Sequence, residues 1–400
     1  MDHGEFRRSR YLRELDGLRA LAILQVVSTH TTDPIWRPLI GPVGVTISFV
    51  NSGFIITTLL LREEEKRGSV RIADFYLRRA FRLLPLYYLV LAVYILLVAV
   101  LHVQPGAQAA WHTLPYYLCY QNDLVTGNWG FNITWSLAVE EKFYLLWPLV
   151  FFTPALLRRW RFPATVMLVL ALMPFALLPG RGAYPAYFAP IVVGCLLAQL
   201  MHRPSTYARL RPLTGTAVTT LILVLVLVDG ATLDHQNGPH VLFAVLVALA
   251  LPACLTGPRR LRAVLASRPL VYVGTRAYPL YLVHRLGKGV VDRVLPPHGA
   301  VWEQGVRYLL IVALGLAAAE VLRRTVEQPM IKLGRRVVAH RAERRKTTAA
   351  QGRRRLERPP TTPAEIGAHA AGTAPPVPAA RPTPDDGRAA LDRLNGMLAE

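Results

Sequence analysis

Long apolar runs recur along this chain of 400 residues, and they constrain its fold more than any other feature. The runs Leu83–Leu101 and Ala217–Val228 are examples, with the length of a membrane span or nearly so. We predict an all-α integral membrane protein with about ten transmembrane helices, at residues 15–32, 44–61, 83–101, 134–152, 164–179, 184–201, 213–228, 239–256, 270–291 and 302–322.

The composition agrees with a chain embedded in a lipid bilayer. Hydrophobic residues make up 52% of the sequence and charged residues 18%, which does not describe a soluble globular protein. The net charge of +21 is gathered in short segments beside the apolar runs, so we expect no nucleic-acid partner. The cysteines, Cys119, Cys195 and Cys254, are widely spaced and indicate neither a metal site nor a disulfide framework.

Basic residues alternate between the predicted connections and set the topology. Arginines crowd residues 62–82, whereas residues 103–133 contain neither lysine nor arginine. Because lysine and arginine are in excess on the cytoplasmic side, we predict an even number of spans with both termini inside the cell. The first span is interrupted by Asp16 and Arg19, so it does not resemble a cleaved signal peptide.

The C-terminal segment differs from the rest. We predict a membrane domain over residues 1–336 and a disordered cytoplasmic tail over residues 337–400, rich in arginine, alanine and proline. Its basic part is expected to lie against anionic lipid, at about 1 kcal/mol for each basic residue near the surface.

Two ionisable residues lie in the first predicted span. Arg19 and His30 are eleven positions apart, which places them on one helix face, about 16 Å apart along the axis. Ionisable residues in a span usually face a polar cavity. Arg19 and His30 therefore either line a polar cavity in which a reaction takes place, or simply extend to the membrane interface.

Further polar residues lie where a purely structural membrane protein would not need them. Arg79 and Arg82 are three positions apart before the third span, and suit phosphate groups or simple anchoring. Glu140 and Tyr144 lie one helical turn apart at the start of the fourth span, and Glu141 with Lys142 resembles an interfacial pair. His284 in the ninth span is equally compatible with a structural role.

Taken in order, six strings resemble the acyltransferase-3 family of ten-helix membrane acyltransferases. They are LDGLRALAILQVVSTH, GVTISFVNSGFIIT, FYLRRAFRLLPLYYL, TWSLAVEEKFYLLWPL, YPLYLVH and VEQPMIKLGRR, and together they cover roughly residues 10–336. Two departures are Asn51, where leucine is common, and Ala20, where glycine is frequent. Asn51 is expected to alter what the cavity accepts.

The resemblance implies a membrane O-acyltransferase in the bacterial cell membrane. Acyl-CoA, by family habit acetyl-CoA, is then a co-substrate rather than a bound cofactor, and the acceptor is a hydroxyl of a cell-surface carbohydrate or glycoside. It implies functional roles for Arg19, His30, Arg79, Arg82 and Glu140. Residues of the same strings are expected to support the site, namely Asp16, Ser52, Trp135, Ser136, Tyr144, Tyr281 and His284.

A mechanism follows from these residue types. His30 is the natural general base for an acceptor hydroxyl, with Glu140 as the candidate to orient its ring. Arg79, Arg82 and Arg19 are expected to bind and guide the acyl-CoA donor. An acyl-histidine intermediate remains open. Three other functions also remain open. The first is a transporter or flippase of a lipid-linked sugar that uses Arg19, His30 and Glu140 as a substrate or proton pathway. The others are a membrane acyltransferase of another class, acting on lipids or proteins, and a non-catalytic scaffold that acts through its basic tail.

Overall fold

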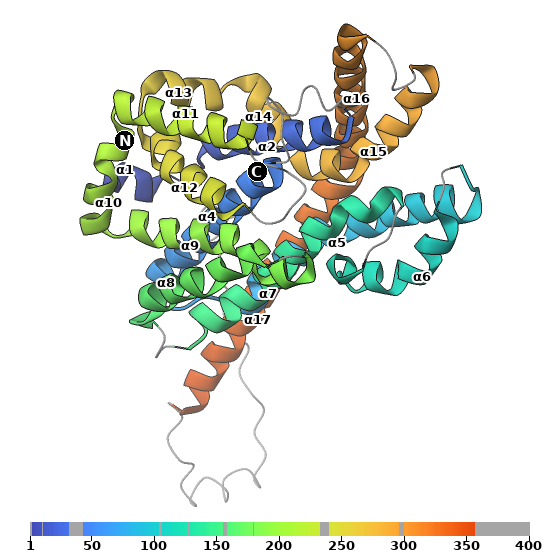
Figure 1. Cartoon of the computed structure of the whole chain (residues 1–400). Coiled ribbons are helices and arrows are strands. Elements are labelled where there is room, and N and C mark those ends of the chain that lie inside the picture. Colours follow the sequence, from blue (N-terminus) through green and yellow to red (C-terminus); the bar gives the residue numbers. More distant parts are fainter. Residues whose placement is uncertain are drawn as a thin grey trace, which may run out of the picture.

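In a computed structural model, the regular structure of the chain is helical, with no strand among the residues that the structure describes (Figure 1). Those residues are 2–9, 11–31, 43–103, 106–125, 129–154, 158–178, 180–232, 240–295 and 300–356. The α-helices are α1 His3–Arg8, α2 Arg13–Thr31, α4 Gly44–Arg67, α5 Ile72–Ile95, α6 Ala107–Leu118, α7 Trp135–Phe152, α8 Arg161–Leu172, α9 Ala189–His202, α10 Pro204–Leu210, α11 Thr216–Thr232, α12 Val241–Thr256, α13 Arg259–Leu265, α14 Arg268–Gly274, α15 Ala277–Val294, α16 Val301–Leu322 and α17 Gln328–Leu356. Shorter 3₁₀ and π segments are η2 Leu96–Val100, η3 Asn122–Leu124, η4 Gly130–Thr134, η6 Met173–Leu177, η7 Gly180–Phe188, η8 Arg211–Thr214 and η9 Arg323–Glu327.

Several of these helices are long and apolar enough to cross a membrane, as expected of a membrane protein. By length and composition, 4 helical segments qualify: Gly44–Arg67, Ile72–Val100, Gly180–His202 and Trp302–Arg345. The number rises to 6 if each of two sharply bent helix pairs is taken as one span. Helices α2, α7 and α15 do not meet this criterion. Each of these three helices carries at least three charged residues, and several of the predicted site residues lie on them.

The most extensive helix–helix contact among the described residues joins α4 to α9. A Cβ atom at Gly53 would lie 1.9 Å from the carbonyl oxygen of Ile191, and one at Gly194 would lie 2.1 Å from that of Val50. Glycine at both positions therefore lets the two backbones touch, which is how small residues bring membrane helices together. These helices belong to the largest hydrophobic core, with α7 and α12.

Helix α2 lies inside the bundle, in contact with α4, α14, α15 and α16. Two glycines permit its close contacts with α13 and α14. A Cβ at Gly17 would lie 2.1 Å from the Leu265 carbonyl oxygen of α13, and one at Gly274 of α14 would lie 1.9 Å from the Asp16 carbonyl oxygen. The predicted face of Arg19 and His30 is thus part of one continuous helix held from several sides.

The predicted span 270–291 consists of two helices. Helix α14 ends at Gly274 and α15 begins at Ala277, with the buried Arg276 between them. The Arg276 guanidinium donates to Glu320 of α16 at 2.5 Å and to the Tyr272 carbonyl oxygen at 3.0 Å. A buried cation is stable only with such partners, so the break is fixed by an ion pair.

Helices α5 and α17 differ most from the sequence prediction. The arginine-rich stretch before residue 83 forms the first turns of α5, which begins at Ile72. Helix α16 continues through the π segment η9 into α17, which runs along α5 and ends at Leu356. The disordered tail predicted from residue 337 is therefore wrong for residues 337–356, where Arg345 is paired with the buried Asp74 at 3.1 Å. Residues 357–400 lie outside the described residues.

A second hydrophobic core is built largely from aromatic side chains. It packs α5 and η2 against α6, η4 and part of α15, through residues such as Tyr87, Tyr94, Tyr117 and Phe131. In Figure 1 this cyan region lies beside the larger group of green and yellow helices.

Candidate active site

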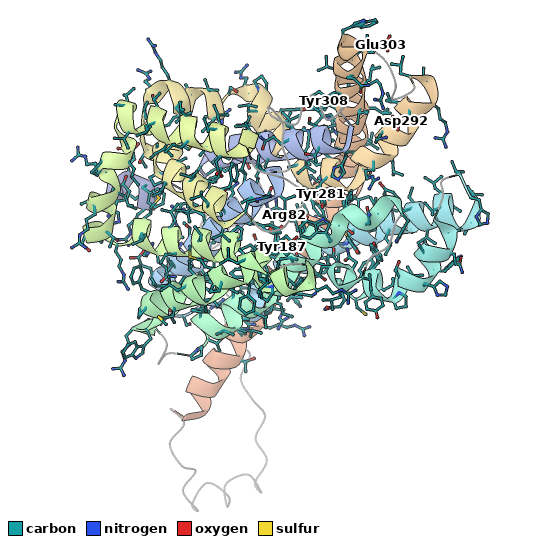
Figure 2. All side chains as sticks on the ribbon, in the orientation of Figure 1. Arg82, Tyr187, Tyr281, Asp292, Glu303 and Tyr308 are labelled. Carbon is teal, nitrogen blue, oxygen red and sulfur yellow. The ribbon has the colours of Figure 1, made fainter. Side chains whose placement is uncertain are left out.

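A cavity of about 250 Å³ lies in the middle of the bundle. Its walls come from α2, α4, α5, α7, the α14–α15 region and η9. Figure 2 labels two of the lining residues, Arg82 and Tyr281, near the middle of the molecule. The polar residues that line it are Arg19, Ser48, Ser52, Arg78, Arg79, Arg82, Ser136, Glu140, Glu141, Tyr144, Thr275, Tyr278, Tyr281 and Glu327.

Arg79 is fully engaged by its neighbours. Its Nε donates to Glu141 Oε2 at 3.0 Å and its Nη2 to Glu141 Oε1 at 2.5 Å, and its guanidinium lies 3.2 Å from the centroid of the Tyr144 ring. A two-point contact with a carboxylate and stacking on an aromatic ring hold the side chain in one orientation. The predicted interfacial pair of Glu141 with Lys142 is therefore wrong: Lys142 bonds Asp123 at 2.6 Å instead.

Arg82 differs from Arg79, three residues earlier on the same helix. Arg82 lines the cavity, and among the described residues no ion pair or hydrogen bond engages its guanidinium. The buried Glu327 of η9 lies within electrostatic range of it, and Glu327 Oε2 has no hydrogen-bond partner in the described chain. The cavity thus contains a cation whose donors are free to bind an anion.

Arg19 is held at the cavity wall by the carboxylate of Asp16. Arg19 Nη1 donates to Asp16 Oδ1 at 2.8 Å, and the Tyr11 hydroxyl donates to Asp16 Oδ2. Asp16 is 1% exposed, so its charge is compensated by these partners. The guanidinium of Arg19 keeps further donors toward the cavity.

Glu140 forms a cluster with Ser52 and Tyr144. The Ser52 hydroxyl donates to Glu140 Oε1, and the Ser52 and Tyr144 oxygens are 2.5 Å apart. Asn51, next to Ser52, does not line the cavity: its side-chain amide donates to the Leu15 carbonyl oxygen of α2 at 3.1 Å. The expectation that Asn51 shapes the cavity is therefore wrong, because its side chain holds α4 to α2.

His30 lies beside His284, a contact that sequence spacing did not predict. His30 Nδ1 is 2.8 Å from the Val26 carbonyl oxygen and 3.4 Å from His284 Nε2, while His284 Nδ1 is 2.7 Å from the Tyr281 carbonyl oxygen. Carbonyl oxygens accept, so both Nδ1 atoms carry the proton. That tautomer leaves Nε2 of the half-buried His30 with a free lone pair, the form needed in a base.

The histidine pair adjoins the cavity rather than lining it. Val26, whose carbonyl oxygen accepts from His30, and Tyr281, whose carbonyl oxygen accepts from His284, both line the cavity. The Tyr281 hydroxyl is 2.8 Å from Ser136 Oγ and donates to the Ile133 carbonyl oxygen. Tyr281 thus lies at the boundary: it lines the cavity, its carbonyl oxygen accepts from His284, and its hydroxyl is held by Ser136 and Ile133.

Most of the predicted site residues meet at this cavity. Those that line it are Arg19, Ser52, Arg79, Arg82, Ser136, Glu140, Tyr144 and Tyr281, with Asp16, His30 and His284 directly behind. Trp135 lies outside it, with its ring 5.1 Å from that of Tyr187. Sequence reasoning missed Arg78, Glu141, Tyr278 and Glu327 as cavity residues; a carboxylate in a long helix, as at Glu327, was the available signal.

Comparisons with known proteins identify relatives of this chain. The sequence profile of the acyltransferase domain of the acyltransferase-3 family matches residues 12–324. A peptidoglycan O-acetyltransferase of Listeria monocytogenes is 27% identical over 366 residues, which is 81% of this chain and 56% of that protein. A Bacillus subtilis protein, whose name assigns it provisionally to the same activity, is 29% identical over 85% of this chain and 59% of its own length. The chain thus spans somewhat more than half the length of these relatives, and no solved structure matches it significantly.

Proposed function

The chain belongs to the acyltransferase-3 family, and on that premise we propose that it is a membrane O-acetyltransferase. It moves an acetyl group from acetyl-CoA to a hydroxyl of a cell-wall carbohydrate. The observation that carries this proposal is a cavity lined by an unpaired arginine, Arg82, with the paired histidines His30 and His284 next to its wall.

The donor enters at the arginine end. Arg82 and Arg19 present free guanidinium donors to the cavity, and a guanidinium binds phosphate through two parallel hydrogen bonds. Arg79 takes a different part in this proposal: its charge is already matched by Glu141, so it shapes the cavity wall. The distance of about 16 Å along α2 between Arg19 and His30 suits an extended thioester arm.

Transfer takes place at the histidine end. His30 Nε2 accepts the proton of the acceptor hydroxyl as its oxygen attacks the thioester carbonyl carbon. The carbon–sulfur bond then breaks, and the departing thiolate takes the proton back from His30. His284, which contacts the His30 ring, orients it; Glu140, bonded to Ser52, organises the middle of the cavity instead.

The reaction is tested with purified protein in lipid nanodiscs supplied with acetyl-CoA and cell-wall glycan fragments. We expect release of free coenzyme A thiol together with acetylated glycan, seen by mass spectrometry. Cells that lack the protein are expected to lose the same acetyl groups from their surface carbohydrate. Glycan that crosses the membrane without consumption of acetyl-CoA would instead support a transporter.

The proposal includes an arrangement in the membrane. Ten helices cross it, the termini are cytoplasmic, residues 1–336 form the membrane domain, and the basic segment beyond it lies against anionic lipid. Cys119 is exposed, whereas Cys195 and Cys254 are buried. We therefore expect a membrane-impermeant thiol reagent to label Cys119 on intact cells.

A matched variant completes the topology test. Lys66 is exposed at the end of α4, and Lys66→Cys in a Cys119→Ser background is expected to react only after the cells are opened. If both positions react from the same side, the ten-helix arrangement is contradicted.

A further inference from the structure

Positive charge gathers on α15 beyond the histidine pair. The helix continues from His284 through Arg285 and Lys288 to Asp292 and Arg293. Figure 2 shows this part of α15 leading from Tyr281 to Asp292, away from Arg82. The second end of the site therefore has its own charged groups, which the donor-binding arginines do not explain.

Two of the cations at this end are satisfied by one carboxylate. Lys288 Nζ donates to Asp292 Oδ2 and Arg307 Nη2 to Asp292 Oδ1. Arg307, which is 2% exposed, also donates to Gln304 Oε1 at 2.8 Å and to the Leu295 carbonyl oxygen at 3.1 Å. This cluster fixes α15 to α16 and has little capacity left to bind a substrate.

Arg285 is different. One nitrogen, Nη1, donates to Asn132 Oδ1 of η4 at 2.9 Å, and within the described chain no carboxylate is paired with its guanidinium. Its side chain is half-buried, and its charge lies within electrostatic range of both His30 and His284. A cation in such a place is stabilised by an anionic partner, and the remaining nitrogens can provide a two-point contact.

We propose that Arg285 binds an anionic oxygen group, a carboxylate or a phosphate, carried by the carbohydrate acceptor. This inference rests on the proposed function. The guanidinium holds the anion while a hydroxyl of the same acceptor reaches Nε2 of His30. The acceptor is thus an acidic carbohydrate, and Arg285 determines specificity rather than taking part in proton transfer.

The experiment compares acceptors that differ in charge. Three probes are used: cell-wall glycan fragments with free carboxylates, the same fragments after amidation of the carboxylates, and a phosphorylated neutral oligosaccharide. Binding to the full-length protein in nanodiscs is measured without donor, and transfer is measured with acetyl-CoA. We expect the protein to prefer one anionic probe over the neutral fragments by about tenfold or more, since hydrogen bonds to charged groups have that strength.

Variants locate the preference. Arg285→Gln is expected to raise KM for the anionic probe about tenfold, with kcat and KM for acetyl-CoA nearly unchanged, and Arg285→Lys to retain part of the preference. Asn132→Ala removes the hydrogen bond to Arg285 but keeps the charge, and should keep the preference. The control for net charge is Arg293→Gln, because Arg293 is exposed in the last turn of the same helix.

The outcomes separate the two proposals. Equal binding of charged and amidated fragments, or a preference that survives Arg285→Gln, overturns the anion site even when transfer is normal. Arg285-dependent binding of the anionic probe without any transfer supports the anion site and contradicts the acetyltransferase. The anionic probe that binds more weakly to Arg285→Gln than to the unmodified protein shows whether Arg285 binds a carboxylate or a phosphate.

Discussion

The contact between α4 and α9 differs from the neighbouring cavity in how its atoms are packed and hydrogen-bonded. At the contact, Gly53 and Gly194 bring the backbones together, and the Cys195 thiol donates to the Gly53 carbonyl oxygen at 3.4 Å. In the cavity, the Arg82 guanidinium and Glu327 Oε2 are left without hydrogen bonds among the described residues. Helix α4 takes part in both, since Ser52 lines the cavity and Gly53 faces α9. The contact is thus closed by backbone packing, whereas these two cavity groups keep hydrogen-bonding capacity that the described residues do not use.

The largest effect is expected on the structural side of this comparison. In Gly53→Val the new side chain has to displace the Ile191 backbone, because even its Cβ would lie 1.9 Å from the carbonyl oxygen. We expect destabilisation of about 3 kcal/mol or more and little folded protein in the membrane, measured by thermal unfolding in detergent. Gly305→Ala is the control, since nothing lies within 4 Å of a Cβ there; equal losses in both variants would contradict the close contact.

The cavity side should show the reverse pattern, with activity lost and the fold kept. His30→Ala is expected to reduce kcat about 100-fold or more, because a general base typically contributes 10²–10⁴-fold. The acid limb of the pH–rate profile should also change, since a protonated imidazole cannot accept the hydroxyl proton. Acetyl transfer and thermal unfolding are measured together.

The control for His30 is chosen from the structure. His284 contacts the His30 ring, so His284→Ala is expected to lower kcat as well, though by less. His112 is exposed on α6, away from this pair, so His112→Ala is the negative control and should leave kcat unchanged. Normal transfer by His30→Ala at normal expression would rule out the base mechanism.

Within the cavity, two of the three arginines of α5, Arg79 and Arg82, are expected to respond differently to substitution. Arg82→Gln should raise KM for acetyl-CoA about tenfold without a change in Tm, because its donors are free for phosphate. Arg79→Gln should instead lower Tm, since it leaves the Glu141 carboxylate without its partner. Arg82→Lys should recover part of the affinity. An identical response of both arginines in KM and Tm would reject this distinction.

The smallest effect is expected at the boundary between cavity and histidines. Tyr281→Phe removes the hydroxyl that contacts Ser136 and the Ile133 carbonyl oxygen. A hydrogen bond of this kind contributes about 1 kcal/mol, so we expect kcat to fall a few-fold. Tyr187→Phe, whose ring packs on Trp135, should leave kcat unchanged; a larger effect there than at Tyr281 would argue against the boundary role.

Local patterns predicted much of this arrangement. The spacing of Arg19 and His30 placed them correctly on one helix, because helical periodicity is a local property. The predicted spans agree with helices at positions such as α4, α7 and α16. The break at Arg276 was not predicted, since its cause is an ion pair with Glu320, 44 residues away. The helical extension to Leu356 was missed because arginine- and alanine-rich sequence was interpreted by its composition alone.

The sequence by itself determined the class of the protein: apolar runs, charged segments between them and six motifs in order indicate a membrane acyltransferase. Only the tertiary structure decided which charges are satisfied. It pairs Arg79 with Glu141 and leaves Arg82 open, and it brings His284 to His30 across 254 residues of chain. The physical reason is that hydrogen bonds and ion pairs act over a few ångströms in space. The distance between two side chains depends on how helices cross, which no local pattern of residues encodes.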